Sequence, residues 1–136
     1  MSLIYADQQN PIVRGGAWPA GGGTIEVTLT RTDAAGVPVD WPADADEWDW
    51  TFLVSHEQLG GTPEMEVSAE VTSLSTNIIV LAVLATSDET VDIAGTSEKR
   101  YFAEIKSDPG GGADASFYGL GYAWVRSAIG AAVAGP

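Results

Sequence analysis

Apolar and polar residues alternate along several stretches of the chain, and this pattern predicts a protein built of β-strands. Ile25, Val27 and Leu29 alternate with polar residues, as in a strand with one buried face. The same period of two recurs over residues 48–55, 64–72, 99–107 and 115–126. Turn sequences rich in Gly, Pro and Asp separate these stretches. We therefore expect six or seven short strands.

Two stretches depart from this alternation. Residues 78–84, with the sequence IIVLAVL, are apolar at every position. Such a strand is either a central strand covered on both faces or a strand with one face against another chain. Residues 86–92, TSDETVD, predict one turn of helix with Thr86 or Ser87 as its N-cap.

The glycine-rich segment 108–112 lies between two alternating stretches and predicts a hairpin that joins residues 99–107 to residues 115–126. Alternation along the second strand of this hairpin divides its side chains between two faces. One face is expected to carry four large residues, Tyr118, Leu120, Tyr122 and Trp124.

Residues 1–23 contain many Gly and Pro residues and show no helical or strand periodicity, so we expect an extended arm that ends in a glycine hinge. The arm also carries apolar side chains, which either pack on the same domain or dock on a neighbouring subunit. The expected organisation is an arm over residues 1–23, a β domain over residues 24–127 and a small-residue tail over residues 128–136.

The number and spacing of the strands predict an all-β fold, an antiparallel β-sandwich of immunoglobulin-like size with one short helical turn. The length of 136 residues suits a single domain. The chain contains no Cys, which excludes a disulfide framework, a thiolate metal site and the Cys–Trp–Cys core of an antibody domain.

The chain carries 19 acidic and 6 basic side chains, a formal net charge of −13. This charge argues against nucleic acid and anionic membranes as partners, because both are bound mainly through Lys and Arg. The longest apolar run, residues 78–85, is too short to span a bilayer, and the N-terminus shows no secretory signal. Acidic residues are concentrated in the first half of the chain. An acidic face toward a basic partner and simple solubility both explain this concentration.

No residue pattern in the chain predicts catalysis, a cofactor or a metal. The single histidine, His56, has Glu57 beside it but no nucleophile motif nearby. The glycine stretches 21–23 and 110–112 lack the sequence forms of phosphate-binding loops. We therefore expect a non-enzymatic protein with no cofactor.

An acidic cluster departs from the EF-hand pattern and is interpreted as a solvated loop, with a Ca²⁺-stabilised domain as the alternative. The cluster consists of Asp40, Asp44, Asp46, Glu47 and Asp49.

Five tryptophans are many for a chain of this length. Carbohydrate-binding modules use exposed Trp and Tyr as stacking platforms, whereas alternation with polar residues favours a place in the core. The residues open to either interpretation are Trp41, Trp48, Trp50, Tyr122 and Trp124. Trp18 and Trp41 lie in segments bounded by Pro and Gly, which favours exposure or contacts between chains. Our candidate inter-subunit contacts are Tyr5, Ile12, Trp18, Trp41, Tyr122 and Trp124.

The order of these features is similar to that of a known group of modules. Arg14-Gly-Gly16 leads into TIEVTLTR, followed by GVPVDW, the Trp-rich WDWTFLV, the apolar NIIVLAV and the helical turn TSDET. The hairpin sequence KRYFAEIKSDPGGG and the aromatic strand YGLGYAWVR complete the series. Over residues 12–127 this order resembles the small β-sandwich modules of bacteriophage and prophage tail, tail-tip and baseplate proteins, especially those of actinobacterial hosts. The long Gly-rich lead and the ADADEWDW insertion depart from that pattern.

The resemblance implies a non-enzymatic structural protein of the virion, made in the bacterial host cytoplasm and located in a minor tail, tail-tip or baseplate position. The implied partners are other virion structural proteins and further copies of the chain in a symmetric ring or fibre base, contacted through arms and sheet edges. The alternative is a carbohydrate-binding or host-receptor-binding adhesin module, with a host-surface glycan as its partner.

Overall fold

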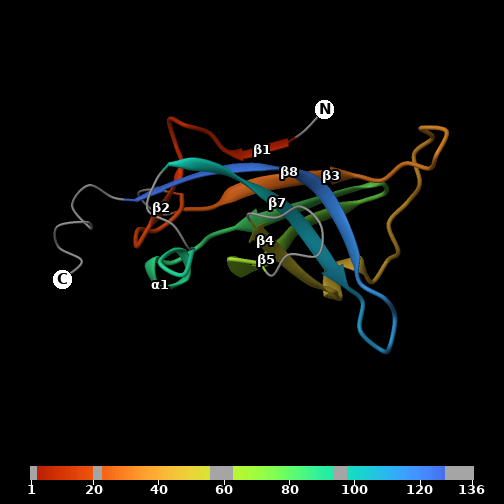
Figure 1. Cartoon of the computed structure of the whole chain (residues 1–136). Coiled ribbons are helices and arrows are strands. Elements are labelled where there is room, and N and C mark those ends of the chain that lie inside the picture. The colour runs from red at the N-terminus through yellow and green to blue at the C-terminus, as the bar shows by residue number, and fades with distance from the viewer. Residues whose placement is uncertain (1–2, 20–22, 56–62, 94–97, 128–136) are drawn as a thin grey trace.

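The computed structural model describes residues 3–19, 23–55, 63–93 and 98–127, in which eight strands form one curled sheet (Figure 1). The strands are β1 (Leu3–Ala6), β2 (Ile12–Arg14), β3 (Ile25–Thr30), β4 (Asp49–Ser55), β5 (Met65–Ser75), β6 (Ile78–Val83), β7 (Lys99–Asp108) and β8 (Ser116–Ser127). Their order in the sheet is β1–β8–β7–β4–β5–β6–β3, and β2 also pairs with β8. The predicted all-β class is confirmed.

The sheet is mixed, so the structure does not show the antiparallel sandwich that the strand pattern predicted. β1 and β2 run parallel to β8, whereas the other neighbouring strands pair in antiparallel fashion. The physical reason is that the N-terminal arm pairs with β8 through its backbone and extends the sheet. The arm and the main body of the domain therefore share one sheet.

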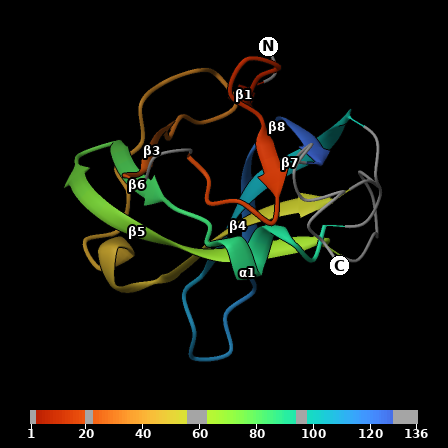
Figure 2. The same ribbon diagram turned by 90° about the vertical axis from the view of Figure 1, so that its left-hand side faces the viewer.

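An isolated bridge between Trp18 and Ala85 draws the two margins of the sheet together. Its two backbone hydrogen bonds, with N–O distances of 2.9 and 2.8 Å, join the end of the arm to the chain that continues β6. The sheet is nearly closed as a result and resembles a barrel, with β3, β5 and β6 on one side and β7 and β8 on the other (Figure 2).

The interior is filled by the apolar positions of the period-two pattern. Phe52, Ile105 and Val125 are fully buried, and all eight strands contribute side chains to this one core. On β6 the residues Ile79, Leu81 and Val83 point inward and are fully buried. On the opposite face of the same strand Ile78 remains 40% exposed.

The apolar run 78–84 is therefore covered on one face only by the described part of the chain. The structure therefore does not show a central strand covered on both faces, which was one of the two interpretations of this stretch. The outer face of β6 is open to another molecule.

A β-bulge in β8 changes which side chains share a face. Ala103 of β7 pairs with Gly121 and Ile105 pairs with Tyr118, so β8 has one residue more than β7 between these pairs. Gly119 adopts a φ of 65°, which glycine tolerates and which a bulge of this kind requires. Tyr118 consequently packs against the core, while Tyr122 and Trp124 lie on the outer face. The prediction of a single face for Tyr118, Tyr122 and Trp124 is wrong for this reason.

Two single helical turns complete the described fold. The predicted turn is α1 (Ser87–Thr90), in which the side chains of Thr86 and Glu89 form a capping box. The 3-10 turn η1 (Ala45–Glu47) lies within the loop expected to be irregular, where the Trp50 Nε1–H donates to the Ala45 carbonyl at 2.8 Å. Neither turn has the length or apolar character of a helix that crosses a membrane.

Candidate functional site

The three arm residues expected at a subunit contact lie inside the chain's own core. Tyr5, Ile12 and Trp18 are 8%, 0% and 2% exposed. The rings of Tyr5 and Trp18 lie 5.0 and 5.3 Å from the ring of Phe52, between ring centroids. The Tyr5 hydroxyl donates to the Gly119 carbonyl. These contacts favour the interpretation in which the arm packs on its own domain, and they leave little open surface on the three side chains.

Arg14 fixes the arm further through buried polar contacts. Its guanidinium donates to the Ile93 carbonyl and to the Tyr101 hydroxyl, both at 3.0 Å, and to the Ser127 hydroxyl at 3.2 Å. Buried polar groups need such partners, because an unpaired one costs about 1 to 3 kcal/mol. Arg14 is therefore a structural residue that connects the arm with β7, β8 and the segment that follows α1.

Trp41 is also buried, although it was a candidate for contacts or for sugar stacking. Its ring lies 5.7 Å from Trp50 and 5.2 Å from Tyr118 in edge-on geometry, and the Arg31 guanidinium lies 5.5 Å from its centroid. Trp50 is buried as well, and Trp48 is half-buried against it. The tryptophans of residues 41–50 form core packing rather than an exposed platform.

Tyr122 and Trp124 are the two candidates that reach the surface. Tyr122 pairs with Phe102 of β7 and with Ile4 of β1, and Trp124 pairs with Arg100. The Phe102 and Tyr122 rings are 5.7 Å apart, and the Arg100 guanidinium lies 4.0 Å from the Tyr122 centroid, a close cation–π contact. We call this surface the aromatic–basic face. It consists of Ile4, Arg100, Phe102, Glu104, Lys106, Phe117, Leu120, Tyr122 and Trp124.

A second open surface lies on the outer side of β6, and we call it the aliphatic–acidic face. Ala82 at its centre pairs with Glu26 of β3 on one side and with Glu70 of β5 on the other. Both glutamates are exposed. The face consists of Glu26, Glu70, Ile78, Val80, Ala82 and Leu84, with the exposed hydroxyl residues Thr28, Thr30, Ser73 and Ser75 beside them on β3 and β5.

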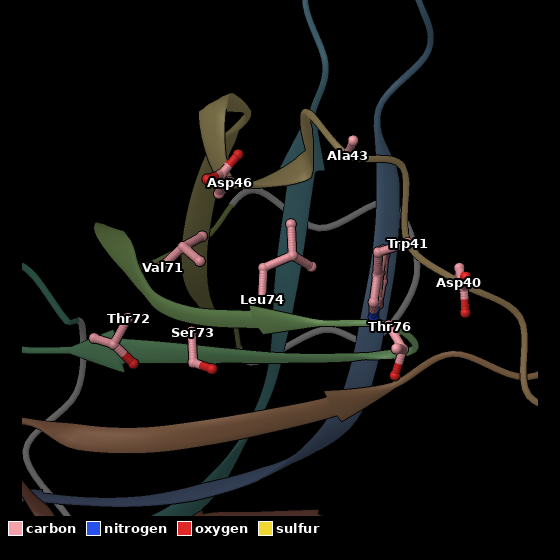
Figure 3. Close-up of a pocket in the computed structure, with 9 residues that line it drawn as sticks. All are labelled: Asp40, Trp41, Ala43, Asp46, Val71, Thr72, Ser73, Leu74 and Thr76. Carbon is pink, nitrogen blue, oxygen red and sulfur yellow. The ribbon is translucent and has the colours of Figure 1, made fainter.

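An open groove of about 600 Å³ lies between the loop of residues 40–46 and strand β5 (Figure 3). Val71 and Leu74 point from β5 toward the part of the loop that carries Asp46 (Figure 3). The groove offers carboxylates and hydroxyl groups to a polar ligand. Its one aromatic residue, Trp41, has its ring covered by core neighbours, so the groove lacks a stacking surface.

The acidic cluster of the sequence does not assemble into a metal site. In residues 3–19, 23–55, 63–93 and 98–127 no three Asp, Glu or His side chains lie in a group that could hold a metal ion. Asp40 and Asp46 line the groove, and Asp49 begins β4. His56 and Glu57 lie outside the described residues, as do the glycines at 21 and 22. The glycines 110–112 form the turn between β7 and β8.

Two titratable groups, Glu104 of β7 and Tyr5 of β1, have shifted pKa values. Burial raises the pKa of the Glu104 carboxyl above its usual range, because a carboxylate loses hydration there. Burial, and to a lesser extent the charge of Glu104, raises the pKa of the Tyr5 phenol. Tyr5 is therefore a neutral hydrogen-bond donor at physiological pH, which suits a structural role.

Comparison with known proteins adds no relative. No protein-family model matches the chain, and no curated protein matches it.

Sequence reasoning missed Arg100, Phe102 and the outer side of β6 as parts of open surfaces. A signal was present in the alternation of KRYFAEIK, which puts Arg100, Phe102, Glu104 and Lys106 on one face of β7. The identity of the inner face could not be read from that stretch alone, because both faces contain aromatic residues.

Proposed function

We propose that this protein is a non-enzymatic structural component of a bacteriophage virion, in a minor tail, tail-tip or baseplate position. The observation that carries the proposal is the pair of open sheet faces with exposed apolar side chains. Among the described residues seven large apolar side chains are strongly exposed, and five of them lie on these faces or at their margins: Ile4, Ile78, Leu84, Phe117 and Leu120. Concentrated apolar surface of this kind is typical of proteins that assemble with others.

The finer description of the fold belongs to the same proposal. In this view the curled sheet is a variant of an immunoglobulin-size sandwich, whose two layers are joined through the pairing of β4 with β5. The resemblance in the order of sequence features supports this view, together with the common core between the two sides of the sheet.

Mass spectrometry of purified particles tests the proposal. We expect peptides of this chain in particles from a host that produces it, at a constant ratio to the other tail proteins, and we expect antibody labelling at the tail end in electron micrographs. Absence of the chain from washed, intact particles would overturn the virion role.

A second candidate, a glycan-binding adhesin module, is favoured by one observation. Phe102, Tyr122 and Trp124 are half-buried neighbours on a sheet surface, which is the arrangement of a stacking platform. A glycan array with the wild-type chain and the Trp124→Ala variant tests it, because Trp124 lies outside the core. Trp41→Ala is unsuitable for this purpose, since Trp41 is 6% exposed and its removal disturbs the core. Binding of no glycan by the wild-type chain would exclude this candidate.

A further inference from the structure

We propose that copies of this chain associate head to tail, with the aromatic–basic face of one copy packed on the aliphatic–acidic face of the next. The inference rests on the structural role proposed above and names its partner as a second copy. Three properties of the two faces carry it: their apolar content, their opposite charge and their places in the fold.

Both faces present apolar side chains to solvent. Ile4 is 66% exposed on the first face, and Ile78 and Leu84 are 40% and 42% exposed on the second. The half-buried rings of Phe102, Tyr122 and Trp124 add flat apolar surface to the first. Two sheet surfaces of this kind pack well face to face, at a separation of about 10 Å.

The charges of the two faces are complementary. On the aromatic–basic face Arg100 and Lys106 outnumber the single carboxylate of Glu104, which gives a net charge of +1. The aliphatic–acidic face carries the carboxylates of Glu26 and Glu70 and no basic side chain, which gives a net charge of −2. In a chain with a net charge of −13, the aromatic–basic face is thus a local exception to the general repulsion between copies.

The two faces lie on different sides of the barrel-like sheet, because β4 and β5 separate β7 from β6 in the strand order (Figure 2). They cannot meet within one molecule, so the contact joins two copies and leaves one face free on each. A heterologous contact of this type repeats, and it produces a closed ring or an open filament.

Glu70→Lys separates specific pairing from general charge effects. This substitution lowers the net negative charge by two, so weaker repulsion alone would strengthen association. Face pairing predicts the opposite, because the introduced lysine of one copy meets Arg100 or Lys106 of the next. We expect the dissociation constant measured by sedimentation equilibrium to rise about tenfold or more. Asp114→Lys, at an exposed position in the turn outside both faces, makes the same change in net charge and is the matched control.

A mixing experiment tests the head-to-tail arrangement. Arg100→Glu damages the first face only, and Glu70→Lys damages the second only, so each variant alone is expected to be largely monomeric. An equimolar mixture contains one undamaged pair of faces, and at the other pair the introduced glutamate meets the introduced lysine. The mixture is therefore expected to associate more tightly than either variant alone, in assemblies in which the two variants alternate. Circular dichroism melting curves check that both variants fold.

Three outcomes would overturn the inference: a wild-type chain that stays monomeric at millimolar concentration in light scattering, a Glu70→Lys variant that associates as tightly as Asp114→Lys, or a mixture that associates no more tightly than either variant alone. Each of these leaves the virion role to be decided by particle mass spectrometry. If the chain self-associates but is absent from particles, the self-association is supported and the proposed virion role is overturned.

Discussion

Two pairs of aromatic residues in this chain have opposite environments. Trp18 and Trp41 lie in segments bounded by Pro and Gly, yet they are 2% and 6% exposed. Tyr122 and Trp124 lie in a strand, yet they are only half-buried, on its outer face. Proline and glycine report local backbone conformation, whereas burial depends on which distant strands pair. Local sequence context is therefore a poor guide to exposure in a curled sheet.

Replacing one tryptophan from each pair should give the largest contrast. Trp18→Ala is expected to lower the free energy of unfolding by about 3 to 5 kcal/mol, because the ring fills the core beside Phe52 and its removal leaves a cavity. Trp124→Ala is expected to cost less, about 1 to 2 kcal/mol, since its ring lies on the outer face of the sheet and is only partly buried. Urea denaturation followed by circular dichroism measures both. Equal losses for the two variants would contradict the inside–outside distinction.

The sequence predicted the central strands well, because period two is the direct consequence of one buried face. The six alternating or apolar stretches correspond to β3, β4, β5, β6, β7 and β8, with ends that differ by three residues or fewer. β1 and β2 escaped detection because they are short and obtain their hydrogen bonds from β8, more than a hundred residues away. Local periodicity contains no information on such pairing.

The candidate surface was only partly predictable. Tyr122 and Trp124 were identified, but their separation from Tyr118 depends on a bulge that no alternation pattern contains. The outer side of β6 was identified as apolar, and the sequence left open whether the same chain covers it. Only the strand order, with polar residues of β3 and β5 on either side, shows that the described chain leaves it open.

The bulge at Gly119 determines which aromatic residues of β8 lie inside. A substitution there therefore tests the difference between the buried and the outer-face aromatic residues. Gly119→Ala is expected to destabilise the fold by about 1 to 2 kcal/mol, because a φ of 65° is unfavourable for a residue with a Cβ atom. Near-ultraviolet circular dichroism should change as well, since Tyr118 and Trp41 are in contact. Gly36→Ala, at a φ of 82° in an exposed turn, is the control for backbone strain without any effect on β8. An aromatic signal that changes equally in both variants would argue against a specific role of the bulge.

Thr76 gives a smaller effect of opposite sign. It lies in the two-residue turn between β5 and β6 with a φ of 48°, and its carbonyl accepts the Trp41 backbone N–H at 2.9 Å. A β-branched residue is strained in this region, whereas Asn tolerates it. Thr76→Asn is therefore expected to raise the free energy of unfolding by about 0.5 to 1 kcal/mol in urea denaturation. A loss of stability would show that the Thr76 side chain itself holds the turn beside Trp41.

Glu104 lies between the two environments, since it is on the outer side of β7 but partly buried, and it gives the smallest expected effect. Burial raises the pKa of its carboxyl in the folded state above the value in the unfolded chain. Below the unfolded pKa the group is protonated in both states and costs nothing. As the pH rises through the folded pKa, the carboxyl group loses its proton more readily in the unfolded chain than in the folded one. The free energy of unfolding decreases as a result.

Glu104→Gln removes this loss, so the variant should be more stable than the wild type at pH 7, and the difference should vanish under acidic conditions. The difference between the two unfolding free energies, measured from acidic to neutral pH, isolates this contribution from that of the other carboxyl groups. Glu66→Gln, at an exposed position on the neighbouring part of the sheet, removes the same charge without the burial. Because both variants weaken the general repulsion equally, a greater gain for Glu104→Gln at pH 7 would come from the burial of Glu104. The same gain in both would place Glu104 with the outer, solvated residues.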